Sequence, residues 1–116
     1  MTRTEVDTLL EQYVAAWSEP DPQARQALLQ AAWHETGDYT DPMAHAAGRE
    51  ELDKLIARFL SANPGARFTL QGQADSHHDY VRFFWTLHFG NGTELPGMDY
   101  GEIGADGRLR KIVGFF

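Results

Sequence analysis

Three side chains of the kinds that give and take protons lie at positions where they can face the interior: Tyr13, Asp41 and Asp99. Tyr13 falls between Leu10 and Trp17 in an apolar series with helical spacing, so its ring is expected to face the core. A buried phenol needs a hydrogen-bond partner. Phenols and carboxylates that share a cavity are able to exchange protons with a bound molecule.

The surroundings of the two aspartates favour an inward orientation. Asp41 shares one face of a short extended segment with Tyr39, and that segment joins two predicted core helices. Asp99 has Gly97 and Gly101 as same-face neighbours on a predicted strand, and these glycines are expected to leave open space for a ligand. Two alternatives remain: an Asp-Pro turn in which Asp41 caps backbone N–H groups, and an exposed Asp99 paired with an arginine.

Helical periodicity occupies the first part of the chain. An apolar stripe predicts a helix at about residues 5–19, with Thr4 and Asp7 spaced as a capping pair. Asp21 is placed as the N-cap of a second helix that runs to about Trp33, with proline in its first helical position.

A third helix and a sheet are expected to follow. The helix opens near Gly48 and stops at about Asn63, and residues 38–42 before it form a short extended piece because of Pro42. After Gly65 the apolar period changes to two, and Gly90-Asn91-Gly92 and Ala105-Asp106-Gly107 are hairpin signals. The pattern predicts a single α+β domain over residues 1–116, with a meander of about four antiparallel strands and helices on one face.

Composition excludes several classes of function. The 116 residues include no cysteine, which removes disulfides, thiolate nucleophiles and cysteine-bound metal centres. Seventeen acidic against ten basic residues give a net charge of −7, which opposes binding to nucleic acid or to anionic lipid. The sequence contains no apolar run of roughly 18 residues and no start typical of a signal peptide, so a cytoplasmic protein is expected.

The sequence resembles the NTF2-like superfamily, which includes ketosteroid isomerases and SnoaL-type polyketide cyclases. The resemblance covers nearly the whole chain and implies a cone-shaped, cystatin-like α+β fold with three N-terminal helices on a curved antiparallel sheet. The residues that carry it are Tyr13-Val14-Ala15-Ala16-Trp17, Tyr39-Thr40-Asp41-Pro42, Gly48, Gly97-Met98-Asp99-Tyr100 and Asp106-Gly107-Arg108-Leu109 with Gly114-Phe115-Phe116.

The resemblance also implies roles for the three acid–base residues. By local pattern and order, Asp41 matches the general base of ketosteroid isomerases, and Tyr13 and Asp99 match the neutral donors to the developing oxyanion. No cofactor is implied. Trp33 and Ile56 stand where the isomerase has tyrosines that support its oxyanion tyrosine.

The function expected on this basis is binding of a small apolar molecule that carries a carbonyl or a phenol. Proton transfer, as in isomerisation or aldol-type cyclisation, would accompany binding. A non-catalytic module for ligand binding or dimerisation is the alternative. Candidates for contact with the ligand are the large aromatics with core spacing, Trp17, Trp33, Phe59, Phe83 and Trp85.

Two further clusters lie in the predicted sheet. Arg82 has the opposite parity to the core residues of its strand, which places it on the outer sheet face and predicts a homodimer through that face. Its companions there are Tyr80, Phe84, Thr86 and His88. His77 and His78 are adjacent in an extended chain, so their side chains are expected to point to opposite sides, and no metal site is predicted.

Overall fold

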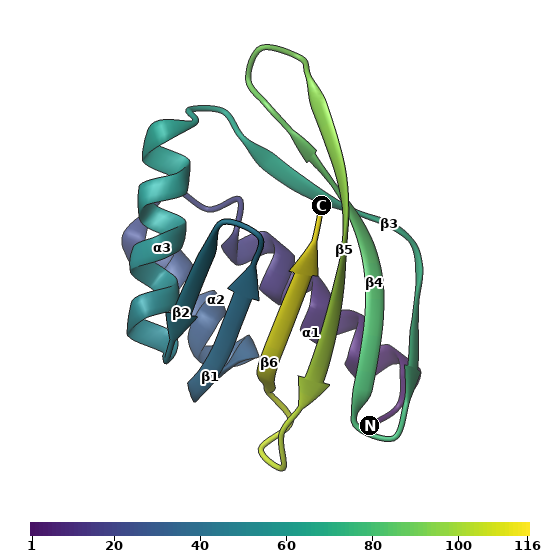
Figure 1. The fold of residues 1–116 in the computed structure, drawn as a ribbon. Helices are drawn as coiled ribbons and strands as arrows, with labels where there is room; N and C mark the ends of the chain where they lie inside the picture. The colour runs from purple at the N-terminus through teal and green to yellow at the C-terminus, as the bar shows by residue number, and fades with distance from the viewer.

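The computed structural model describes all 116 residues. Three helices lie against a six-stranded sheet (Figure 1), so the predicted α+β organisation is confirmed. In chain order the elements are α1 (Arg3–Ala16), α2 (Pro22–Ala32), β1 (Trp33–Asp41), β2 (Ala44–Ala47), α3 (Arg49–Ala62), β3 (Arg67–His77), β4 (Tyr80–His88), β5 (Glu94–Ile103) and β6 (Leu109–Phe115).

The first helix begins two residues earlier than predicted, and the predicted capping pair is wrong. Thr2 is the N-cap: its hydroxyl accepts a hydrogen bond from the Glu5 backbone N–H, and the Glu5 carboxylate accepts one from the Thr2 N–H at 2.9 Å. This reciprocal arrangement satisfies two N–H groups at the helix start. The second helix begins as predicted, with the Asp21 carboxylate accepting from the Ala24 N–H at 2.9 Å.

Trp33 is the first residue of β1 and not the end of α2, so the extended segment is longer than predicted. The strand is irregular, since its register against β6 shifts between Trp33 and Asp38. Gly37 lies within this shift, where a β-carbon would come within 2.6 Å of the Trp33 indole nitrogen. An irregular strand has no clean alternation of apolar residues, which explains why the pattern did not reveal it.

The sheet order is β2-β1-β6-β5-β4-β3, with the predicted four-stranded meander forming β3 to β6. Its neighbouring pairs are antiparallel, and β1 and β2 form an antiparallel hairpin. One pairing departs from the expected antiparallel sheet, because β1 lies parallel to β6. The last strand of the chain therefore lies in the middle of the sheet and joins the first hairpin to the meander.

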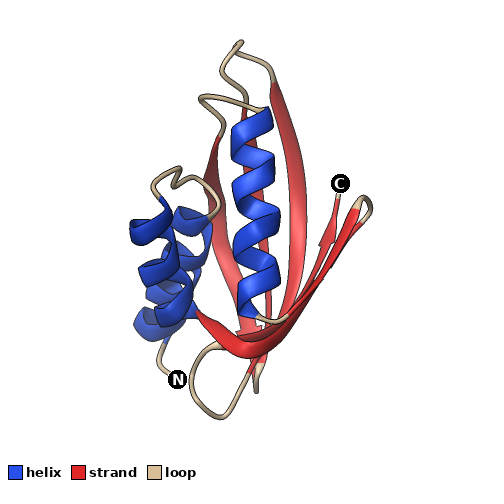
Figure 2. Cartoon of the chain, turned by 90° about the vertical axis from the view of Figure 1, so that its left-hand side faces the viewer, coloured by secondary structure: helices blue, strands red, loops and turns tan.

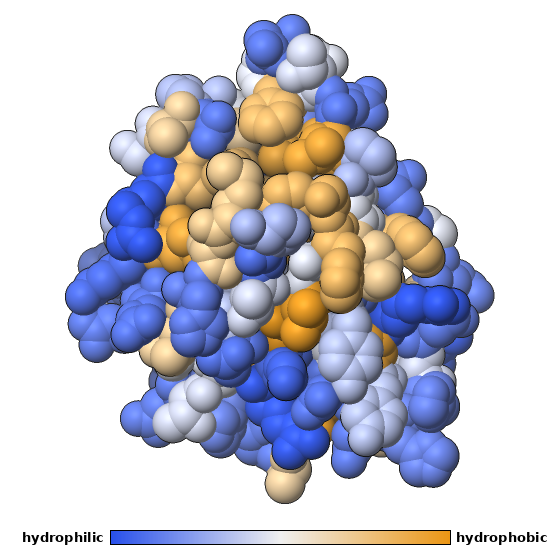
Figure 3. Space-filling view, viewed as in Figure 1, coloured by the Kyte–Doolittle hydropathy of each residue, from blue (hydrophilic) through white to orange (hydrophobic).

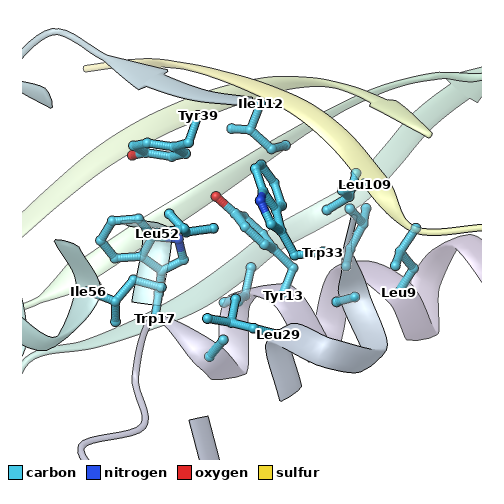
Figure 4. Packing of buried hydrophobic residues seen from close by; sticks show 14 of the residues in the cluster. Leu9, Tyr13, Trp17, Leu29, Trp33, Tyr39, Leu52, Ile56, Leu109 and Ile112 are labelled. Atoms are coloured by element: carbon cyan, nitrogen blue, oxygen red, sulfur yellow. The ribbon is translucent and has the colours of Figure 1, made fainter. Parts of the chain in front are cut away.

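All three helices lie on one side of the curved sheet (Figure 2). Between the layers is a continuous apolar core that includes the fully buried Leu29, Leu52, Ile56, Leu109 and Ile112 (Figure 4). None of the helices is long and apolar enough to cross a membrane.

A buried ion pair fixes α3 against the other helices. The Arg25 guanidinium on α2 is 3% exposed and donates to the Asp53 carboxylate on α3 at 2.6 Å. It also donates to the backbone carbonyls of Glu19 and Pro20 after α1. A single charged side chain thus joins α2 to α3 and to the connection between α1 and α2, and this holds α3 in place over the sheet.

Candidate active site

A cavity of about 440 Å³ lies between α1, α3 and the sheet, and the three predicted acid–base residues all line it. Most of its lining is apolar. On the surface, an apolar area surrounds the C-terminal end of β6, between α3 and the β4–β5 hairpin (Figure 3). The lining consists of Tyr13, Val14, Trp17, Tyr39, Asp41, Met43, Ala44, Leu55, Arg58, Phe59, Ala62, Asn63, Phe68, Trp85, Leu87, Phe89, Leu95, Asp99 and Phe116.

Tyr13 is held by aromatic contacts and lacks a hydrogen-bond partner. Its ring stacks on Trp33 at a centroid distance of 5.6 Å and meets the edge of Phe83 at 6.4 Å (Figure 4). The residue is 1% exposed, and its hydroxyl has no partner in the protein. Burial, with a smaller effect from the charge of Asp99, raises the pKa of Tyr13 well above its usual value. The group is therefore a neutral donor that is free to bind a ligand.

Asp99 is a buried carboxyl group near the middle of β5. It is 5% exposed, and its Oδ1 accepts a hydrogen bond from the Trp85 indole N–H at 3.1 Å. Burial raises the pKa of Asp99 to about 7, and the nearby Asp41 charge acts in the same direction, while the Trp85 hydrogen bond opposes both. The neutral and charged forms are therefore both populated near neutral pH.

Asp41 lies at the end of β1. It both faces the cavity and caps a turn, the two arrangements that the sequence left open. Its Oδ1 accepts from the Met43 backbone N–H at 2.8 Å, as in an Asp-Pro turn, and its Oδ2 accepts from the Tyr39 hydroxyl at 2.6 Å. Burial raises the pKa of Tyr39, which keeps this phenol protonated as a donor. The carboxylate also lines the cavity, so the turn itself positions it there.

Gly114 on β6 leaves the space that brings the two carboxyl groups close together. A β-carbon at this position would lie 3.0 Å from Asp99 Oδ1 and 3.4 Å from the Asp41 β-carbon. Gly114 pairs with Asp99 in the sheet register. Sequence reasoning missed this role, because the glycine sits in an otherwise ordinary apolar strand and only the β1–β6–β5 order shows what flanks it.

The expectation that Gly97 and Gly101 open space for a ligand is wrong. A β-carbon at Gly97 would overlap the Trp85 indole ring, which packs directly on that backbone. At Gly101 the space is filled by Ile112 and Val81, which would be 2.8 and 3.0 Å from an added β-carbon. Both glycines therefore make room for core side chains. The space at Gly97 is occupied by the Trp85 indole, which donates to Asp99.

The aromatic candidates divide into two groups. Trp17, Phe59 and Trp85 line the cavity, whereas Trp33 and Phe83 do not and are 0% and 2% exposed. The expectation that Trp33 and Phe83 contact a ligand is therefore wrong: both are core residues that pack against Tyr13. Cavity residues that the sequence did not single out include Met43, Arg58, Asn63, Phe68 and Phe116.

The expectation that the side chains of His77 and His78 point to opposite sides is also wrong. The Nδ1 atoms of His77 and His78 lie 3.1 Å apart, because His78 has a φ of 53° and turns the chain out of the strand. No group of three or more histidine, aspartate or glutamate side chains is arranged to hold a metal ion.

The sequence was compared with known protein families and structures. Residues 10–112 match the model of the SnoaL-like domain. A SnoaL-like family protein from Agrobacterium tumefaciens, for which an isomerase activity has been suggested, is 34% identical over 97% of both chains, with a TM-score of 0.89. No protein with curated functional information matches the sequence.

Two more distant structures show the same fold. One is a protein with a ketosteroid isomerase-like fold from Catenulispora acidiphila in complex with trimethylamine, with 17% identity, 93% and 84% coverage of the two chains and a TM-score of 0.78. The other is a cystatin-like protein of unknown function from Methylobium petroleophilum, with 17% identity, 99% and 77% coverage and a TM-score of 0.82. The family match over most of the chain and the shared fold establish that this protein belongs to the SnoaL-like domain family of the NTF2-like superfamily.

Proposed function

We propose that the cavity binds a small apolar molecule with a carbonyl or phenol group. When the ligand has a carbonyl, a carboxylate of the cavity removes a proton from the neighbouring carbon and returns it to the ligand. The unpaired Tyr13 hydroxyl carries this proposal, since a buried donor without a partner is costly unless something binds it. The family supports an isomerase or cyclase in general terms.

In this mechanism the ligand oxygen takes hydrogen bonds from Tyr13 and from neutral Asp99. Asp41 removes a proton from the α-carbon: the C–H bond breaks, its electron pair moves into the enolate, and negative charge develops on the oxygen. The two donors stabilise that charge in a site with little water. Return of the proton from Asp41 to another carbon completes an isomerisation and restores the carboxylate.

One observation favours the non-catalytic alternative. Both Asp41 oxygens already accept hydrogen bonds, from Tyr39 and from the Met43 backbone. Proton abstraction by this carboxylate would have to compete with these two hydrogen bonds, and a cavity that only binds its ligand would have the same arrangement. Binding and proton transfer therefore need separate measurements.

Replacing Tyr13 with phenylalanine tests binding. We expect Tyr13→Phe to leave the free energy of unfolding unchanged or to raise it by up to about 1 kcal/mol, because a buried unpaired hydroxyl is removed. Affinity for 2-naphthol should fall about tenfold or more, because one donor to its oxygen is lost. The measurements are chemical denaturation and a fluorescence titration. Ser61→Ala removes an exposed hydroxyl from α3 outside the cavity lining, and as the control it should leave naphthol binding unchanged. Equal naphthol binding by Tyr13→Phe would refute the proposed contact.

We further propose that two copies of the protein associate through the outer sheet face. Tyr80 and Phe84 are 43% and 50% exposed on β4. In the register, Phe84 pairs with Met98 and Met98 with the half-exposed Phe115, which makes an apolar row across three strands. Such an apolar row on the outer face of the sheet suits a two-fold contact with another copy of itself.

Phe84→Glu tests this dimer. A carboxylate at the β4 end of the row should weaken association at least tenfold, because it would be buried without a partner. Sedimentation at micromolar concentrations measures the effect. Gln23→Glu adds the same charge on exposed α2 and should leave the dimer intact. A wild-type protein that is strictly monomeric would rule the dimer out.

A further inference from the structure

Arg58 brings a positive charge to a cavity whose other charged groups are acidic. It is the one basic residue in the lining. With Leu55, Phe59 and Ala62 it forms a stripe on α3 at the spacing of a single helix face, and all four residues line the cavity. A basic residue thus occupies a position on the helix face that meets the ligand space.

No carboxylate of the protein neutralises Arg58. The positions three and four residues away on the helix hold Lys54, Leu55, Ser61 and Ala62, none of which is acidic. Lys54 pairs instead with Glu50 at 3.2 Å. The basic side chains that do form ion pairs with a carboxylate are Arg3, Arg25, Lys54, Arg82, Arg108 and Arg110.

An aromatic path connects the acid–base groups to Arg58. Tyr39, which donates to Asp41, lies 5.3 Å from Trp17 between ring centroids, and Trp17 lies 6.0 Å from Phe59. Phe59 is the next residue after Arg58 on α3. The cavity therefore has proton donors and acceptors on the side of the sheet and α1, aromatic walls, and a cation on the side of α3.

We propose that the ligand of this cavity is an amphipathic acid, with a carbonyl or phenol at one end, an apolar body, and a carboxylate or similar anion at the other end that binds the Arg58 guanidinium. A planar guanidinium is well suited to bind a carboxylate through paired hydrogen bonds. This inference rests on the proposed function of the same cavity. In a protein with 17 acidic and 10 basic residues, recognition of an anion requires such a local cation.

Matched pairs of probes that differ only in a carboxylate test the inference. The pairs are phenol with 4-hydroxybenzoate, 2-naphthol with 6-hydroxy-2-naphthoate, and 4-phenylphenol with 4′-hydroxybiphenyl-4-carboxylate. These place the anion at three distances from the phenol. At low salt, we expect the carboxylate of at least one pair to bind about three- to tenfold more tightly than its neutral partner, measured by calorimetric titration.

Two variants assign that preference to its source. Arg58→Gln should abolish the preference for the carboxylate, measured as the ratio of the two affinities within each pair, since the contact with the anion is removed. Arg67→Gln is the matched control, because Arg67 is an exposed arginine outside the cavity lining that also forms no ion pair, and it should keep the preference. Equal loss in both variants would show a general charge effect and overturn the inference.

The outcomes separate this inference from the proposed function. If the wild-type protein binds both members of every pair equally, the role of Arg58 is overturned, while phenol binding that depends on Tyr13 leaves the proposed function standing. If no phenol binds at all, the proposed function fails and this inference fails with it.

Discussion

Asp99→Asn is expected to make the protein more stable at mildly alkaline pH while weakening its binding of phenols. Asparagine keeps the shape of the side chain and an oxygen to accept from Trp85, but it cannot ionise. In the wild-type protein, burial raises the pKa of Asp99 from its ordinary 3.8 to about 7. Above that pH the native state must hold a charge that the unfolded chain exposes to water.

The direction of the pH dependence follows from linkage. Between the unfolded pKa of 3.8 and the folded pKa of about 7, native Asp99 binds more protons than unfolded Asp99, so wild-type stability falls as pH rises through this range. A separation of about three pKa units corresponds to on the order of 4 kcal/mol. The advantage of the variant should therefore grow between pH 4 and pH 8 and then level off.

Chemical denaturation of both proteins at a series of pH values measures this difference. A 2-naphthol titration alongside should show weaker binding by the variant, because an amide is a poorer donor to an oxyanion than a carboxylic acid. Trp85→Phe offers a second check: loss of the indole donor should raise the pKa of Asp99 further. An Asn variant that is less stable at neutral pH and binds naphthol normally would remove Asp99 from the proposed site.

The elements with clear periodicity could be predicted from the sequence, whereas the irregular ones could not. The third helix and the hairpin at Gly90-Asn91-Gly92 lie where the pattern places them. The β1 strand begins earlier than the pattern indicates, because its register shift interrupts the alternation of apolar and polar residues. Its parallel pairing with β6 joins segments that are about seventy residues apart, and local spacing contains no information about such a contact.

The sequence could predict which acid–base residues share the cavity. It could not predict most of the contacts that these residues make. Tyr13, Asp41 and Asp99 share one cavity, as the resemblance implies. The Trp85 hydrogen bond to Asp99 and the close fit of Gly114 depend on distances across strands, so only the structure reveals them. For the same reason, the sequence pattern does not show that the glycines beside Asp99 accommodate core side chains.

Asp41→Asn is expected to have the largest effect on chemistry with little effect on binding. The asparagine oxygen can still accept from the Met43 N–H, so the turn that ends β1 should persist. The base is lost, however, and positioned general bases contribute roughly 10²- to 10⁴-fold to rate. We expect 2-naphthol to bind this variant within about threefold of wild type, because the oxyanion donors Tyr13 and Asp99 are retained and burial is the largest cause of the raised Asp99 pKa.

Exchange of the α-protons of 2-tetralone with deuterated water, followed by nuclear magnetic resonance, tests the acid–base function of the cavity most directly. This ketone has about the size of 2-naphthol and reports proton abstraction even when no product forms. We predict that the wild-type protein accelerates exchange above the buffer rate, that Asp41→Asn loses at least 100-fold of that acceleration, and that Tyr13→Phe loses part of it. Exchange at the buffer rate by a wild-type protein that binds 2-naphthol saturably would contradict proton transfer and leave a cavity that only binds its ligand.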